Sequence, residues 1–281
     1  MAGKIWFITG ASRGIGALTV EAALAAGDKV AATGRSVDAL KERFGAREGL
    51  LLLAMDVTDE AAIARALEAA IAHFGHIDVV LNNAGYGMLG TLEESTMEEF
   101  RACVETNFFG TVLVCKAAVP HLRKRGAGHI INVTSAGGFR PVQGFSAYCA
   151  AKFAVEGLTE TLGMELAPLG IHVTALQPGY VKSDFCEDNS LVIVPKEMPE
   201  YADITGGIRR AMENKQVGQP GDPAKVAQGI VALGHAENPP RWLPLGADSV
   251  AIIESKLADV QADIDAWREL ACSTYFDEAT A

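Results

Sequence analysis

The sequence predicts an α/β fold: a single doubly wound domain with a parallel sheet of seven strands and helices on both faces. Two observations support this prediction. Short apolar runs alternate with helical stretches along most of the chain, which is the pattern of consecutive βαβ units. The first run, Ile5 to Thr9, is almost entirely apolar, as expected for a strand that is covered on both faces of a parallel sheet.

The length and composition indicate one folded domain. The 281 residues are 49% hydrophobic and 21% charged, which is typical of a globular protein rather than a disordered one. We therefore expect residues 1–281 to form a single domain. The net charge of −11 argues against nucleic acid or an anionic membrane as the main partner. The longest apolar runs look too short for a membrane span.

The N-terminus and the cysteines indicate a cytoplasmic protein. Residues 1–4 lead directly into the expected strand at residues 5–9 and lack the length and cleavage site of a signal peptide. The five cysteines are odd in number and include no CxxC pair, so reduced thiols are expected rather than disulfides. No cluster of His, Cys and carboxylate residues has the spacing of metal ligands, and we assign no metal.

Seven runs are the expected strands, and helical stretches separate them. The strands cover residues 5–9, 29–33, 50–54, 79–81, 129–133, 172–176 and 241–245. The helices cover residues 17–26, 60–74, 97–125, 147–169, 223–233 and 249–270. Gly27 ends the first helix, and Pro120 is expected to kink the third. Asp222-Pro223 resembles an N-cap followed by proline at the first helical position.

The regular alternation breaks after the sixth expected strand. Residues 182–220 contain no clear strand, and so long a stretch inside a compact domain suggests a substrate-binding lid. Its apolar side chains favour an apolar or medium-sized carbonyl substrate over a small sugar. Residues 221–281 form a C-terminal extension, and we expect the tail from Cys272 to Ala281 to be loosely held.

A glycine-rich turn follows the first expected strand. Thr9 to Gly16 reads TGASRGIG and leads into an Ala-rich helix. Glycines permit a tight turn and a close approach of the backbone, and the helix N-terminus offers N–H groups to a diphosphate. The spacing is GxxxGxG rather than GxGxxG, so the turn is informative mainly through its position between strand and helix. It predicts the start of a dinucleotide-binding unit.

The end of the second strand favours a cofactor with a 2′-phosphate. An acidic residue about twenty positions beyond the glycines is typical of NAD binding, but Gly34-Arg35-Ser36 stands there. Arg13 lies inside the glycine turn. Two guanidinium groups suit a 2′-phosphate through charge-assisted hydrogen bonds. The alternative is that Arg13 and Arg35 are solvated surface residues, and we prefer NADP(H).

Tyr148 and Lys152 stand one helical turn apart, which places an ammonium beside a phenol. A neighbouring positive charge lowers the pKa of a tyrosine, so the pair predicts a proton donor and acceptor. Alone, such a pair is more typical of a solvated helix face. Ser135 follows the fifth strand, where ligands bind in open α/β sheets. Asn107 lies amid apolar neighbours, where a satisfied core amide is the ordinary interpretation.

Together these residues resemble the classical short-chain dehydrogenase/reductase family, whose fold is a Rossmann-type domain. The motifs that carry the resemblance are TGASRGIG, the NNAG segment at Asn82 to Gly85, Asn107, Ser135, Tyr148 with Lys152, and Pro178-Gly179. They occur in the family's order and extend to about Ser183, where the family usually has Thr. The C-terminal part is similar, more weakly, to the hydroxysteroid-dehydrogenase-like and retinol-dehydrogenase-like branch.

The resemblance implies roles for four catalytic residues. Tyr148 would exchange a proton with the substrate oxygen, and Lys152 would lower the pKa of Tyr148 and bind the nicotinamide ribose. Ser135 would hydrogen-bond the carbonyl oxygen. Asn107 would hold the helix backbone and a water that relays protons past Lys152. Cys149, beside Tyr148, is interpreted as a small buried residue rather than a redox group.

The resemblance also implies a cofactor site and partners. The residues expected to contact NADP(H) are Gly10, Ser12, Arg13, Gly14, Ile15, Gly16, Arg35, Asp56, Val57, Asn83, Ala84, Gly85, Tyr148, Lys152, Pro178, Gly179, Val181 and Ser183. The expected partners are a small carbonyl or alcohol substrate and further copies of the chain. A homodimer or homotetramer would form through the long helices at residues 97–125 and 147–169.

Three functional interpretations follow from these residues. The leading one is an NADP(H)-dependent carbonyl reductase or alcohol dehydrogenase. The second is an NAD(H)-linked alcohol or hydroxysteroid dehydrogenase that works mainly in the oxidative direction. The third is a non-catalytic regulator that senses NADP(H). The intact set of Asn107, Ser135, Tyr148 and Lys152 argues against a regulator, because a sensor has no need of a proton relay.

Overall fold

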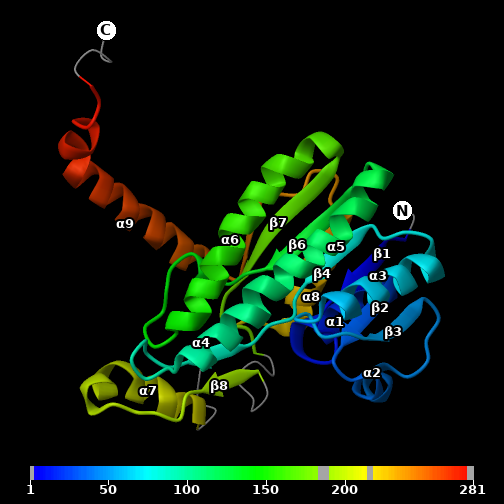
Figure 1. Cartoon of the computed structure of the whole chain (residues 1–281), viewed down its shortest axis with the longest axis horizontal. Helices are drawn as coiled ribbons and strands as arrows, with labels where there is room; N and C mark the ends of the chain where they lie inside the picture. The colour runs from blue at the N-terminus through cyan, green and yellow to red at the C-terminus, as the bar shows by residue number, and fades with distance from the viewer. Residues whose placement is uncertain (1–2, 183–189, 214–217, 277–281) are drawn as a thin grey trace.

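The computed structural model describes residues 3–182, 190–213 and 218–276. Its centre is a seven-stranded sheet with the order β3-β2-β1-β4-β6-β7-β9, in which every neighbouring pair is parallel (Figure 1). The order reverses beside β1, so the sheet is doubly wound as predicted. The strands are β1 (Ile5–Ile8), β2 (Lys29–Gly34), β3 (Leu50–Ala54), β4 (Val79–Asn82), β6 (Gly128–Val133), β7 (Ile171–Pro178) and β9 (Trp242–Leu245).

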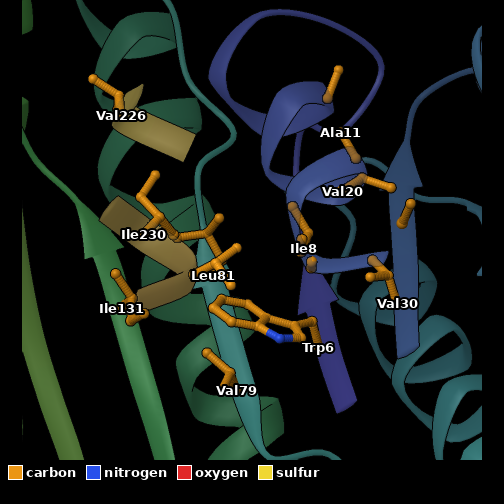
Figure 2. Close-up of a cluster of buried hydrophobic side chains, with 14 of the residues drawn as sticks. Trp6, Ile8, Ala11, Val20, Val30, Val79, Leu81, Ile131, Val226 and Ile230 are labelled. Atoms are coloured by element: carbon orange, nitrogen blue, oxygen red, sulfur yellow. The ribbon is translucent and has the colours of Figure 1, made fainter. Parts of the chain in front are cut away.

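Helices cover both faces of the sheet and divide its side chains between two cores. The helices of the sheet layers are α1 (Gly14–Ala25), α2 (Val37–Phe44), α3 (Glu60–Phe74), α5 (Gly110–Arg125), α6 (Ser146–Leu166) and α8 (Pro223–His235). Trp6 and Ile8 join the core beneath α1 and α8, whereas Phe7 joins the core beneath α3 and α5. Successive side chains of a strand point to opposite faces, which explains why the run is apolar at every position. Figure 2 shows the first of these cores.

A buried polar cluster centred on Asp28 lies at the edge of the first core. The carboxylate of Asp28 accepts hydrogen bonds at 2.8 Å from the backbone N–H of Lys4 and from the indole N–H of Trp6. The ring of His235, at the end of α8, also lies 2.8 Å from this carboxylate. Asp28 is only 3% exposed. The cluster therefore ties the start of β1 to the end of α8, because a buried carboxylate needs such partners.

The helical run expected over residues 97–125 is interrupted by a π-helical turn that contains Asn107, and Pro120 lies inside its last part. It consists of α4 (Met97–Val104), a π-helical turn (Glu105–Phe109) and α5. The run is also long and apolar enough to cross a membrane, by length and composition only, which corrects our expectation that every apolar run is too short. Val114 and Leu122 of α5 are buried in the core beneath α3, and core helices commonly pass such a test.

The segment 182–220 differs from its prediction in having regular structure. Leu191–Ile193 forms β8, which pairs in parallel with β5 (Gly87–Leu89), and Ala202–Glu213 forms α7. Arg209 of α7 makes a 3.2 Å ion pair with Glu94, and both side chains are buried. Arg209 also donates to the carbonyl of Val194 at 2.9 Å. These contacts fasten α7 to the β5 region. We call residues 182–220 the lid segment.

The last helix, α9 (Ala247–Cys272), is somewhat longer than expected and projects away from the sheet (Figure 1). Helix α2 was not expected, because its eight residues form little more than two turns. A serine N-cap begins it: Ser36 accepts from the N–H of Ala39 at 3.2 Å.

Candidate active site

An open cavity of about 1460 Å³ lies where the strands of the sheet end. Its walls include Gly10 after β1, Gly34 at the end of β2, Asn83 after β4, and Pro178 at the end of β7. The lid segment contributes Val192 and other residues to the opposite wall. Ligands of open α/β sheets bind outside the carboxyl ends of the strands. The fold therefore places a large pocket where a ligand is expected.

Ser135, Tyr148 and Lys152 meet in this cavity. Ser135 follows β6, and its hydroxyl makes a hydrogen bond with the Tyr148 hydroxyl. Lys152 is buried one turn further along α6, with its Nζ 5.8 Å from the centre of the Tyr148 ring. This Nζ donates to the carbonyl of Val133 at 2.9 Å. The three polar groups predicted from the sequence are thus held together by α6 and the end of β6.

Burial opposes charge on both titrating groups of this cluster. Desolvation raises the pKa of Tyr148 above its usual value of 10.0, and the hydrogen bond from Ser135 acts against this rise. Desolvation lowers the pKa of Lys152 from 10.5 to about 8. We expected Lys152 to lower the pKa of Tyr148, but in this structure desolvation dominates. The site favours a neutral phenol, which can donate a proton.

Asn107 sits in the π-helical turn and is fully buried. Its Nδ2 donates to the carbonyls of Tyr86 at 3.0 Å and Cys103 at 2.9 Å, and its Oδ1 accepts from the Tyr86 N–H at 3.1 Å. The side chain therefore bridges two backbone segments, as in the core-amide interpretation. A Cβ at Gly85 would lie 2.5 Å from Asn107 Oδ1. Glycine at this position thus lets the two segments approach.

The glycine turn after β1 forms a tight cradle beside the cavity. Gly10 has a φ of 64°, and a Cβ there would lie 2.8 Å from the Cα of Ala84. A Cβ at Gly16 would overlap the carbonyl of Gly10 and the amide of Asn83. That Asn83 amide donates to the carbonyls of Thr9 at 3.0 Å and Gly10 at 3.1 Å. The glycine turn and the NNAG segment therefore pack directly against each other.

This cradle fits a dinucleotide phosphate. The first-turn residues of α1 line the cavity, where a helix N-terminus attracts an anion. The predicted cofactor residues that line the cavity are Gly10, Ser12, Arg13, Gly14, Ile15, Arg35, Asp56, Val57, Asn83, Ala84, Gly85, Tyr148, Lys152, Pro178, Gly179 and Val181. Gly16 does not line the cavity but packs against the Gly10 carbonyl and the Asn83 amide on the other side of the turn. Ser183 lies outside the described residues.

Several residues of the cavity wall carry no sequence signal. Tyr86, Arg140 and Ile252 line it, from three separate parts of the chain. None belongs to a motif with fixed spacing, so only the fold reveals them.

Among the residues that the structure describes, no group of three His, Cys, Asp or Glu could hold a metal ion. Cys149 is buried, and desolvation raises the pKa of its thiol.

Comparison with known proteins identifies the family. The short chain dehydrogenase family matches residues 4–191. The chain belongs to the short-chain dehydrogenase/reductase family. It is therefore an oxidoreductase, and its Rossmann-type sheet is the family fold. The match does not specify the hydroxysteroid- or retinol-dehydrogenase-like branch.

Two relatives and one solved structure illustrate the similarity. The chain is 37% identical over 274 residues to the oxidoreductase BOA17 of Botryotinia fuckeliana, covering 96% of this chain and 99% of that one. It is 37% identical over 239 residues to a 3-ketodihydrosphingosine reductase of Bacteroides thetaiotaomicron, covering 84% and 86%. A short-chain dehydrogenase structure from Streptomyces avermitilis superposes with a TM-score of 0.90 at 37% identity, covering 98% and 100%.

Two further neighbours of this dehydrogenase were solved with nicotinamide cofactors. The 3-ketoacyl-(acyl-carrier-protein) reductase of Brucella melitensis, complexed with NADH, has a TM-score of 0.74 at 28% identity and covers 88% of this chain and 98% of its own. The enzyme ElxO, with NADP bound, has a TM-score of 0.73 at 25% identity and covers 89% and 99%. The neighbours therefore include both forms of the cofactor.

Proposed function

We propose that this dehydrogenase transfers hydride between NADP(H) and a carbonyl or secondary alcohol, with an apolar or medium-sized ketone or aldehyde as substrate. The observation that carries the proposal is the cluster at the end of β6, where Ser135 hydrogen-bonds Tyr148 above the buried Lys152. The cofactor supplies the hydride chemistry when it is bound. The neighbours with bound NADH and NADP support a nicotinamide cofactor.

In this proposal the protein's own residues position the substrate and handle its proton. Ser135 and Tyr148 hydrogen-bond the carbonyl oxygen and stabilise the negative charge that develops on it. Tyr148 gives its proton to that oxygen during reduction and removes it during oxidation. Lys152 stabilises the resulting phenolate, and Asn107 holds the backbone that frames the pocket beside it.

The preference for NADP(H) rests on the end of β2. Arg35 directly follows this strand, and both Arg35 and Arg13 line the cavity. Guanidinium groups bind a phosphate through bidentate, charge-assisted hydrogen bonds. The carboxylate typical of NAD binding does not stand in the Gly34-Arg35-Ser36 segment. We therefore place the 2′-phosphate between Arg13 and Arg35.

The preference for an apolar substrate rests on the outer wall of the cavity. Val142, Phe145, Val192, Ile208 and Ile252 line it. Such walls favour substrates with apolar groups, and a few polar groups orient the reacting atoms. The relative named as a 3-ketodihydrosphingosine reductase supports a ketone as the substrate class.

The first experiment compares initial rates with NADPH and NADH over a panel of ketones, aldehydes and alcohols, including steroids. We expect turnover with a strong preference for NADPH. Tyr148→Phe should abolish turnover and keep NADPH binding, while Tyr275→Phe, on the exposed tail, is the matched control. Substantial turnover by a clean Tyr148→Phe preparation would remove Tyr148 from its role.

The second experiment tests the 2′-phosphate site with Arg35→Ala. We expect the Kd for NADPH to rise much more than the Kd for NADH. Arg43→Ala is the control, because Arg43 is an exposed arginine of α2 that pairs with Glu21 instead. Equal losses for both cofactors would exclude Arg35 from the site. NADPH binding without turnover of any panel member would favour the sensor.

A further inference from the structure

Most of helix α9 extends beyond the body of the protein (Figure 1). Ser249, at its base, is the single buried residue among the described positions of this helix. Large apolar side chains beyond the base face solvent, including Leu257 at 54% exposure and Trp267 at 66%. An exposed helix is marginal in water unless an apolar face is packed. Such a run of exposed apolar residues is typical of an interaction surface.

The apolar residues of α9 follow a heptad repeat. Positions a and d, spaced alternately by four and three residues, are Val250, Ile253, Leu257, Val260, Ile264, Trp267 and Ala271. Every large apolar side chain from Leu257 to Cys272 lies at a or d, except Leu270 at the neighbouring g position. The outer positions b, c and f over the same span hold Ala, Asp, Glu and Cys. Apolar a and d positions with polar outer positions are typical of a coiled coil.

The body of the protein holds α9 by the face opposite this stripe. Arg140, which follows the short helical turn after β6, donates to Ser255 Oγ at 2.9 Å and to Asp259 Oδ2 at 2.7 Å. Ser255 and Asp259 occupy f and c positions. Ile252, also at c, lines the cavity. The fold therefore anchors the back of the helix, and the a and d side chains from Leu257 onward are exposed.

We propose that this face binds α9 of a second copy of the chain in an antiparallel two-stranded coiled coil centred near Ala262. In this register Leu257 packs against Trp267 of the second copy, and Val260 packs against Ile264. Ile253 meets the small Ala271. The interface obeys a two-fold axis, so each contact occurs twice. The paired segment from Ile253 to Ala271 is about 27 Å long.

Charges beside the stripe favour this register. The e positions are Glu254, Gln261 and Arg268. In the proposed register Glu254 faces Arg268 of the second copy, and Gln261 faces its own counterpart at the two-fold axis. A shift of one heptad in either direction separates Glu254 from Arg268. On the other edge Asp263 meets its counterpart, which is a like-charge contact that opposes pairing.

The alternatives fit these residues less well. A parallel coil would pair Asp263 at g with Arg268 at e of the second copy, but it would stack Trp267 on Trp267 and bring both protein bodies to the same end of the coil. Leu at d, with β-branched residues at a, is what parallel dimers favour, whereas Val260 and Trp267 hold the d positions here. A membrane surface is disfavoured because the helix carries Asp259, Asp263 and Asp265 beyond its base.

The first test measures mass in solution by sedimentation at several concentrations. The chain weighs 29.6 kDa. We expect Ile264→Arg to halve the mass of the wild-type assembly. Ala262→Arg adds the same charge on the f face and should leave the mass unchanged. A monomeric wild type, or an unchanged mass for Ile264→Arg, would overturn the proposal. Circular dichroism and binding of NADPH check that each variant is folded.

The second test fixes orientation and register. In a Cys272→Ser background, Gln261→Cys should form a disulfide-linked dimer on mild oxidation, since the two e positions meet at the axis. Ala262→Cys, on the back of the helix, is the control and should not. Halving of the mass by Ile264→Arg without this crosslink would overturn the antiparallel register, since e positions lie apart in a parallel coil.

The third test exchanges charges. Glu254→Arg should weaken dimerisation, and adding Arg268→Glu to it should restore dimerisation. Asp263→Asn should tighten the dimer about two- to threefold by removing the like-charge contact. A double variant weaker than the single one would contradict the register. Flotation of monomeric wild-type protein with phosphatidylcholine and phosphatidylglycerol vesicles would instead assign the stripe to a membrane.

Discussion

Replacing Lys152 by methionine should make the folded protein more stable at neutral pH while removing its activity. Burial lowers the pKa of this lysine from 10.5 to about 8. In the unfolded chain the lysine regains its ordinary pKa. Below pH 8 the Lys152 ammonium therefore destabilises the folded state, because its charge is desolvated there and hydrated in the unfolded chain. Methionine fills a similar volume and carries no charge.

The size and sign of this effect follow from linkage. One pKa unit corresponds to about 1.4 kcal/mol, so the shift of Lys152 corresponds to about 3 kcal/mol. Between about pH 8 and 10.5 the unfolded chain holds a proton that the folded chain has lost. The stability of the wild type therefore rises with pH in this window. The penalty is complete below pH 8 and absent above 10.5.

The assay is urea unfolding of wild type and Lys152→Met in parallel from pH 7 to 10.5. We expect the difference between their unfolding free energies to be constant up to about pH 8. It should then change by about 3 kcal/mol in favour of the wild type. The lost hydrogen bond to the Val133 carbonyl adds a constant offset, which does not depend on pH. A difference that stays flat over the whole range would refute the reasoning.

Three other perturbations test contacts that hold the fold and the glycine turn in place. Glu94→Gln removes the buried carboxylate that pairs with Arg209, leaves only the exposed Glu197 at 3.9 Å, and should lower stability by about 3 kcal/mol; an unchanged melting temperature would show that the pair is solvated. Gly16→Ala forces the glycine turn away from the NNAG segment, and calorimetry should show NADPH binding weakened at least tenfold, while Gly157→Ala, which points into open space, binds normally. Asp28→Ala removes the acceptor of three donors and should cost about 3 kcal/mol in urea unfolding; a loss below about 1 kcal/mol would mean that water replaces it.

The sheet was predictable because local and global signals agree there. Trp6, Phe7 and Ile8 must all be apolar, since successive side chains enter different cores. The glycine turn was equally readable, because Gly10 needs a positive φ and close contact with Ala84 at once. Ser135, Tyr148 and Lys152 were predicted together because their order and spacing resemble the motif of the family.

Other features depend on contacts between distant segments. The pairing of β5 with β8 joins Gly87 to Leu191, about a hundred positions apart, through two three-residue strands. Neither strand is long enough to show a period of its own. The pKa of Tyr148 depends on how deeply the fold shields the hydroxyl. The spacing alone predicted that Lys152 lies beside Tyr148 and lowers its pKa. It could not predict desolvation, which raises that pKa and has the larger effect.

The apolar composition of the lid segment has two separate causes, and two valines distinguish them. Val192 is 44% exposed and lines the cavity, whereas Val194 is fully buried against Gly90. Val192→Ala should therefore change KM values across a panel of ketones while leaving the melting temperature nearly unchanged. Val194→Ala should lower stability by about 2 kcal/mol and preserve the ranking of substrates. The reverse pattern would mean that Val194, rather than Val192, contacts the substrate.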